Sequence, residues 1–122
     1  MGRYIDGFVI PVAKDRVEEY RGVAEKAALV WKEHGALDYW ECVGDDLGGD
    51  DLCHGSFPQF VRAGADETVI FAWAVFESRE HRDLANERIM ADPRIKEMMD
   101  PDKPLFDFKR MAHGGFKELV HA

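Results

Sequence analysis

The sequence predicts an α+β fold of the ferredoxin-like kind, a sandwich in which helices cover one face of a four-stranded antiparallel sheet. A strand–helix–strand pattern occurs twice within 122 residues, which is the β-α-β β-α-β order of that fold. The first unit joins strands at 4–12 and 37–43, and the second joins strands at 68–76 and 106–111. A chain of this length accommodates a single domain, residues 1–122.

The strand at 68–76 is apolar on both of its faces. Successive residues of a strand point to opposite sides of the sheet, so alternate residues share a face. Helices on one side of the sheet cover only one of these faces, and we therefore expect a homodimer joined sheet to sheet. One face would carry Val69, Phe71, Trp73 and Val75, and the other Ile70, Ala72, Ala74 and Phe76.

A long helix follows the first strand. Asp15 is expected to cap it, with Glu18 three residues later completing a capping box. Apolar residues then recur at helical spacing and form one stripe. Gly35 is expected to end the helix, because glycine adopts the left-handed conformation without strain. The stripe consists of Val17, Tyr20, Ala24, Ala27, Ala28 and Trp31.

The second strand, at 37–43, follows after a very short turn. Alternation places Tyr39 and Glu41 on one of its faces. The polar segment at 44–55 has no periodicity and is typical of a loop. Ser56, with a proline two residues later, is expected to begin a short helix.

The second half of the chain repeats this order. Ser78 is expected to cap a helix at 79–90, and Asp92 with the proline after it begins a second, short helix. The alternating apolar residues at 106–111 predict the fourth strand. The two glycines at 114–115 suggest a bulge and a short final strand or tail.

The charge of the chain restricts its partners. Acidic residues outnumber basic ones by 24 to 16, giving a net charge of −8, so we expect neither nucleic acid nor a membrane surface as a partner. No segment approaches the roughly 20 apolar residues of a membrane span, and the first residues lack the pattern of a signal peptide. We expect a cytoplasmic protein in which Cys42 and Cys53 are free thiols.

Glu41 is the first candidate for chemistry. A carboxyl group on a buried strand can act as a general acid or base, and the hydroxyl of Tyr39 on the same face would orient a substrate. The alternative is a structural ion pair. The second and fourth strands are edges of a ferredoxin-like sheet, so across a dimer seam Glu41 would meet Lys109 or Arg110 of the partner's fourth strand.

Other candidates carry weaker signals. His113 follows the fourth strand, where a turn can open onto a pocket, and either His113 or His54 would assist Glu41. The acidic loop at 44–55 offers oxygen ligands for Ca²⁺ or Mg²⁺, and Cys53 with His54 would suit Zn²⁺. Its spacing does not match an EF-hand, so we expect a solvated loop and assign no metal and no cofactor. No motif for a nucleophile, a P-loop or a dinucleotide site occurs.

Several stretches distributed over nearly the whole chain resemble the YbaA-like bacterial proteins, a family known as domain of unknown function 1428. The resemblance implies a dimeric α+β barrel. It implies no activity, because the family has none to transfer. The stretches are Tyr4-Ile-Asp-Gly-Phe-Val-Ile-Pro-Val12, Trp31-Lys-Glu-His-Gly-Ala36, Glu41-Cys-Val43, Ser78-Arg79, Met90-Ala-Asp-Pro-Arg94, Met98-Met-Asp-Pro101, Lys109-Arg-Met111 and Gly114-Gly-Phe116.

Two functional hypotheses follow. In the first, a homodimer binds or transforms a small, partly apolar organic molecule in a pocket beside the sheet, with Glu41 and Tyr39 in acid–base roles. In the second, the dimer is a non-catalytic module for ligand sensing or protein interaction. An open pocket with Glu41 facing it favours the first, and a pocket filled by aromatic side chains favours the second. The aromatic residues in question are Tyr4, Phe8, Trp40, Phe71, Trp73, Phe76, Phe106 and Phe108.

Overall fold

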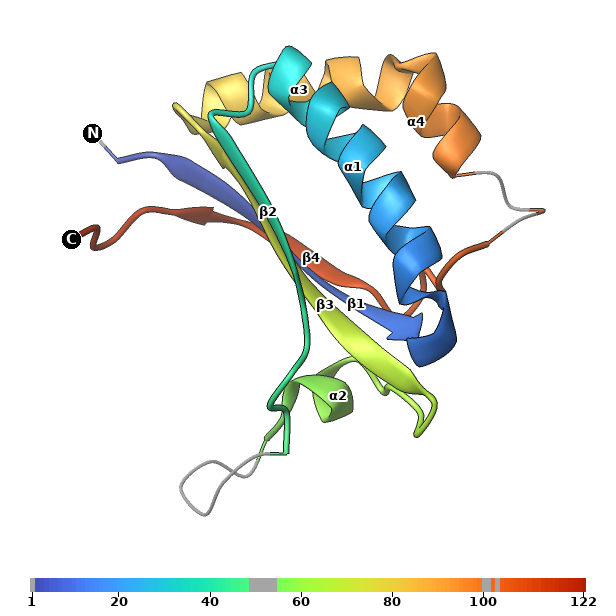
Figure 1. Cartoon of the computed structure of the whole chain (residues 1–122). Helices are drawn as coiled ribbons and strands as arrows, with labels where there is room; N and C mark the ends of the chain where they lie inside the picture. Colours follow the sequence, from blue (N-terminus) through green and yellow to red (C-terminus); the bar gives the residue numbers. More distant parts are fainter. Residues whose placement is uncertain (1, 49–54, 100–101, 103) are drawn as a thin grey trace.

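The computed structural model describes residues 2–48, 55–99, 102 and 104–122. Four strands form one antiparallel sheet in the order β2-β3-β1-β4. Helices α1, α3 and α4 lie over one face of this sheet, and the short helix α2 lies at the other (Figure 1). The predicted α+β class and four-stranded antiparallel sheet are therefore confirmed.

The boundaries of most elements agree with the expected ones to within two residues. Each predicted serine cap is present: Ser56 accepts a hydrogen bond from the backbone N–H of Gln59, and Ser78 from that of His81. Gly35 has a φ of 123°, as expected of a helix-ending glycine. The strands are β1 (Tyr4–Ala13), β2 (Asp38–Val43), β3 (Glu67–Phe76) and β4 (Ala112–Lys117), and the helices are α1 (Val17–Glu33), α2 (Phe57–Phe60), α3 (Arg79–Ala91) and α4 (Pro93–Met98).

The alternation in β3 divides its apolar residues between the two faces as predicted. Ile70, Ala72, Ala74 and Phe76 are buried beneath the helices. On the opposite face Val69 is buried against Val61, which directly follows α2. Phe71, farther along the same face, leaves 44% of its surface exposed. The second face of the sheet is thus apolar and only partly covered.

The cap predicted for the first helix is wrong. Asp15 lies in a short 3₁₀ turn, Lys14–Arg16, that precedes α1, and no side chain caps the helix. Glu18 pairs with Arg21 on the helix surface, with 2.9 Å between Oε2 and Nε. The 3₁₀ turn moves the start of the helix beyond Asp15, which removes the spacing that a capping box needs.

The fourth strand was predicted too early in the chain. Residues 106–111 form no strand and contain a turn at 108–110, and β4 comprises Ala112–Lys117. The backbone N–H of Lys109 donates to the side chain of Asp107 over 2.9 Å, and that of Arg110 donates to the Asp107 carbonyl over 3.1 Å. These bonds close a turn, which the alternation of Phe106 and Phe108 did not reveal.

The two glycines at 114–115 lie inside β4 rather than in a bulge. Gly114 pairs with Gly7 of β1, and the ring of Phe116 covers both glycines on the outer face, the face of the sheet opposite α1, α3 and α4. On the helix side, a Cβ at Gly115 would overlap the Tyr4 ring and lie 2.7 Å from Nη1 of Arg82. Glycine at this position therefore allows two side chains of the helix-facing layer to approach the backbone of β4.

Candidate functional site

A cavity of about 510 Å³ lies between the sheet and its covering helices. We call it the inner cavity. All four strands, the three helices α1, α3 and α4, and the segment at 105–111 contribute to its wall. Ala24 and Ala27 of α1 and Ala72 of β3 are among the lining residues, and such short side chains leave space between the two layers. Its volume falls within the ~300–1,000 Å³ of typical small-molecule sites.

Glu41 lines this cavity from β2, on the helix-facing side of the sheet. The hydroxyl of Tyr39 donates to Glu41 Oε2 over 2.7 Å, and the hydroxyl of Tyr20 donates to Oε1. Each carboxylate oxygen therefore has one phenol donor. Burial, together with the nearby charge of Glu41, raises the pKa of Tyr20 and that of Tyr39, so both phenols remain protonated donors.

The pairing of Glu41 with Tyr39 was predicted from the sequence, whereas the contact of Tyr20 with Glu41 was not. The α1 stripe placed Tyr20 in the core, where it is only 5% exposed. A buried tyrosine hydroxyl needs a hydrogen-bond partner, which was the available signal. A single sequence does not show which strand residue faces a given turn of the helix, so Glu41 was not identifiable as that partner.

A second polar group lies on the same face of the sheet. Asp6 of β1 is 5% exposed, and its Oδ1 is 2.6 Å from Nη1 of Arg82. The side-chain amide of Asn86 donates to Oδ2 over 3.3 Å. None of these three residues was predicted as part of a site. The available signal was Asp6, because a carboxylate at a buried position of a central strand needs a polar partner.

His113 lines the inner cavity but lies far from Glu41. Both residues face the helices in one cross-strand row, with Phe8 and Ala72 between them. Three strand intervals of about 4.8 Å separate their backbones by about 14 Å. The His113 ring stacks against Phe8 with 6.2 Å between ring centres. A single reacting atom therefore does not contact both Glu41 and His113. Of the predicted residues, Tyr39 lies beside Glu41, whereas His113 lies at the opposite edge of the sheet.

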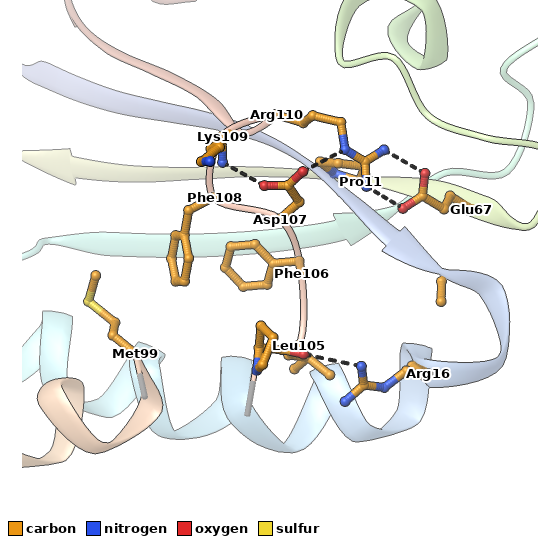
Figure 2. Close-up of a pocket in the computed structure, with 12 residues that line it drawn as sticks. Pro11, Arg16, Glu67, Met99, Leu105, Phe106, Asp107, Phe108, Lys109 and Arg110 are labelled. Carbon is orange, nitrogen blue, oxygen red and sulfur yellow. Dashed lines mark hydrogen bonds and ion pairs between the residues drawn. The ribbon is translucent and has the colours of Figure 1, made fainter. Parts of the chain in front are cut away.

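The segment at 104–110 also lines a second hollow of about 560 Å³, the outer hollow, whose lining residues are shown in Figure 2. Phe106, Phe108 and Met99 line both spaces, and the two phenylalanine rings lie 4.7 Å apart. Arg110 forms two hydrogen bonds with Glu67, of 2.6 and 2.8 Å, and these hold the segment against the start of β3. The pair lowers the pKa of Glu67 to about 2, chiefly through these hydrogen bonds.

The proposed ion pair of Glu41 with a cation at 109–110 relied on a fourth strand at 106–111, which the structure lacks. Glu41 also faces the helices rather than the open face of the sheet. Arg110 instead pairs with Glu67 of its own chain. Lys109 lines the outer hollow.

The metal hypothesis concerned the acidic loop at 44–55. Residues 49–54 of that loop, including Cys53 and His54, lie outside the described residues, as does any assistance of Glu41 by His54. Among the residues that the structure describes, no group of three or more His, Cys, Asp or Glu side chains is placed to hold a metal ion. Cys42 is an exposed free thiol on β2. No helix in the described part of the chain is long and apolar enough to cross a bilayer.

The chain is similar to proteins whose activity is not known. Residues 3–108 match the family model described as "Protein of unknown function (DUF1428)". The uncharacterised protein YbaA of Escherichia coli (strain K12) is 41% identical over 118 residues, which cover 97% of each chain, and its Shigella flexneri counterpart is equally similar.

Solved structures of low sequence identity share the fold. A NIPSNAP family protein of unknown function from Agrobacterium tumefaciens superposes with a TM-score of 0.63 at 15% identity, over 99% of this chain and 92% of that one. An uncharacterised NIPSNAP-like domain protein from Burkholderia xenovorans gives a TM-score of 0.61 at 12% identity, over 99% and 89%. At these identities the likeness establishes the fold and nothing of the chemistry.

Proposed function

Because the chain belongs to the DUF1428 family, which is itself of unknown function, we propose a function from the inner cavity alone. The protein binds a small, partly apolar organic molecule in this cavity and moves a proton between that molecule and Glu41. The observation that carries the proposal is a carboxylate with two phenol donors at the wall of an unfilled, mainly apolar space. A convergent polar group in such a space is the usual sign of a ligand site.

The arrangement assigns a role to each side chain. Glu41 accepts a proton from an acidic C–H, N–H or O–H bond of the ligand and returns it at another atom or to water. The hydroxyls of Tyr20 and Tyr39 hold the carboxylate in one orientation, since each donates to a different oxygen. The wall is mainly apolar and Glu41 is part-buried, so water screens the carboxylate less than it would on the open surface. His113 is too far away to act on the same atom and would contact the other end of a ligand.

We further propose that the protein acts as a homodimer joined through the outer faces of two sheets. Trp40 and Trp73 stack there with 5.7 Å between ring centres, and the ring centres of Phe71 and Trp73 lie 5.4 Å apart. Trp40 is 52% exposed and Phe71 44%. This row of aromatic side chains suits a second copy of the same face, because a monomer would leave the row in water.

Deuterium incorporation tests proton transfer without knowledge of the natural substrate. The protein would be incubated in heavy water with a panel of aryl ketones and β-keto esters, and exchange at their acidic C–H positions followed by NMR. We expect catalysed exchange for at least one compound, its loss in Glu41→Gln, and its retention in Glu25→Gln, an exposed α1 residue outside the cavity.

The outcomes separate the two functional hypotheses. Exchange that survives in Glu41→Gln would refute the role of the carboxylate. Compounds that bind without exchange in the wild type would favour the non-catalytic module for ligand sensing. If no compound of the panel binds, the cavity does not take molecules of this class and the proposal fails.

A further inference from the structure

The charges that line the inner cavity do not balance. Four of its lining residues carry ionisable acidic or basic groups other than phenols, namely Asp6, Glu41, Arg82 and His113. Asp6 and Arg82 neutralise each other at 2.6 Å. Glu41 accepts from two neutral phenols, and no cation of the described residues lies within ion-pair distance of it. The cavity therefore holds one carboxylate, that of Glu41, without a cation beside it among the described residues.

Each oxygen of the Glu41 carboxylate has one phenol hydroxyl as a hydrogen-bond partner, Tyr20 at Oε1 and Tyr39 at Oε2. Glu41 is part-buried at the cavity wall, where water screens its charge less than it would on the open surface. Two phenols provide the hydrogen bonds but no positive charge, so the pairing partner is missing from the described chain.

Aromatic rings surround this carboxylate. Trp31 contacts Tyr39 with 5.8 Å between ring centres, and Phe106 meets the edge of Tyr20 at 6.0 Å. All four rings line the inner cavity. Rings within about 6 Å of a cation attract it through their negative faces, and amine-binding sites commonly combine such rings with a carboxylate.

We infer that the ligand of the inner cavity is an organic cation, with an ammonium group placed between Glu41 and the rings of Tyr20, Tyr39 and Trp31 and an apolar body along the rest of the wall. This rests on the proposed function and names the class of molecule that the site takes. An anionic ligand would place a second negative charge beside Glu41. The net charge of −8 on the whole chain also favours the approach of cations over anions.

The apolar body of such a ligand would lie among soft side chains. Four of the five methionines of the chain line the inner cavity, and unbranched thioether side chains adapt to ligands of different outline. The same residues provide reporters, because methionine methyl signals in NMR shift when a molecule binds against them. These residues are Met90, Met98, Met99 and Met111.

Three probes of matched shape test the inference: naphthylethylammonium, naphthylethanol and naphthylacetate. Each would be titrated into the full-length protein, with methionine-methyl NMR locating the binding and calorimetry measuring the affinity. We expect the ammonium compound to bind about tenfold more tightly than the alcohol and the carboxylate to bind most weakly. In Glu41→Gln the advantage of the ammonium over the alcohol should fall to less than about twofold, while Glu25→Gln, which removes one exposed charge, should keep it.

The outcomes distinguish a failure of the cationic ligand class from a failure of the proposed function. Equal or tighter binding of naphthylacetate, with shifts of the cavity methionines, would overturn the cationic class and leave the proposed function intact. An ammonium preference that persists in Glu41→Gln would overturn the assignment of the charge to Glu41. If none of the three probes shifts the cavity methionines, both this inference and the proposed function fail. Should Glu41→Gln not fold, the ranking of the three probes in the wild type still decides.

Discussion

Among single isosteric substitutions near the inner cavity, we expect the largest loss of stability when the Asp6–Arg82 ion pair is broken. Asp6→Asn keeps the shape of the side chain and removes its charge, which leaves the guanidinium of Arg82, with only 16% of its side chain exposed, without its closest partner. Breaking a buried pair in this way costs about 3–5 kcal/mol.

Two contacts reduce that figure. Arg82 keeps the carboxylate of Asp83 at 2.8 Å and lies 4.7 Å from the centre of the Tyr4 ring. The oxygen of an asparagine at position 6 also still accepts a hydrogen bond. We therefore expect Asp6→Asn to lower the free energy of unfolding by about 2–3 kcal/mol.

Urea unfolding followed by tryptophan fluorescence measures the effect, at one protein concentration so that any dimerisation is held constant. A double-mutant cycle with Arg82→Met should give a coupling energy of about 2 kcal/mol. Asp83→Asn, whose side chain is 58% exposed, is the control and should change stability by less than about 0.5 kcal/mol. An Asp6→Asn protein within about 0.5 kcal/mol of the wild type would refute the reasoning.

Three further predictions concern the outer face, the phenol donors and the segment at 104–111. If the protein is the proposed dimer, Trp73→Asp should give a folded monomer in analytical ultracentrifugation. Ala72→Asp, on the helix-facing side, should unfold the protein, and a Trp73→Asp protein that is still dimeric would contradict the sheet-to-sheet arrangement. Tyr39→Phe removes a hydrogen bond to a charged group and should cost about 1–2 kcal/mol in thermal unfolding, and no loss would mean that this bond is not formed. Arg110 lowers the pKa of Glu67 to about 2, so the pair contributes its full stabilisation above the unfolded pKa of about 4.5 and loses it as the pH falls towards 2. Glu67→Gln should reduce this acid-induced loss of unfolding free energy by about 1 kcal/mol. An unchanged dependence of stability on pH in the variant would disprove the assignment.

The fold was predictable from the sequence where periodicity and local chemistry act together. The ferredoxin-like order predicted the second and fourth strands as the edges of the sheet, which leaves β3 inside it. The alternation of 68–76 assigned Ala72 and Phe71 to opposite faces correctly. The caps Ser56 and Ser78 were predictable because a serine hydroxyl accepts from a backbone N–H only three residues away. These features depend on neighbours in the chain.

The errors arose where a residue far away in the sequence decides the structure. Phe106 and Phe108 alternate as in a strand, but Phe106 packs against Tyr20 of α1 and the Asp107 turn redirects the chain. The glycines at 114–115 suggested a bulge, but they pair regularly with β1, and the contacts of Phe116 and Arg82 with their backbone come from other parts of the fold. Local patterns do not contain these tertiary contacts.

The candidate site was predictable in part for the same reason. Tyr39 and Glu41 lie two residues apart on one strand, so their proximity follows from alternation alone. The contribution of Tyr20, from a helix 21 residues earlier, depends on how α1 crosses the sheet. The separation of His113 from Glu41 depends on the strand order, which puts β2 and β4 at opposite edges.

The central claim is that the inner cavity is an open ligand site with Glu41 at its wall. A crystal structure of the protein with naphthylethylammonium tests this most directly. We predict electron density for the probe between α1 and the sheet, with its ammonium nitrogen within about 3 Å of a Glu41 oxygen. A cavity closed by the side chains of Trp31 and Phe106, with Glu41 turned towards solvent, would contradict the account.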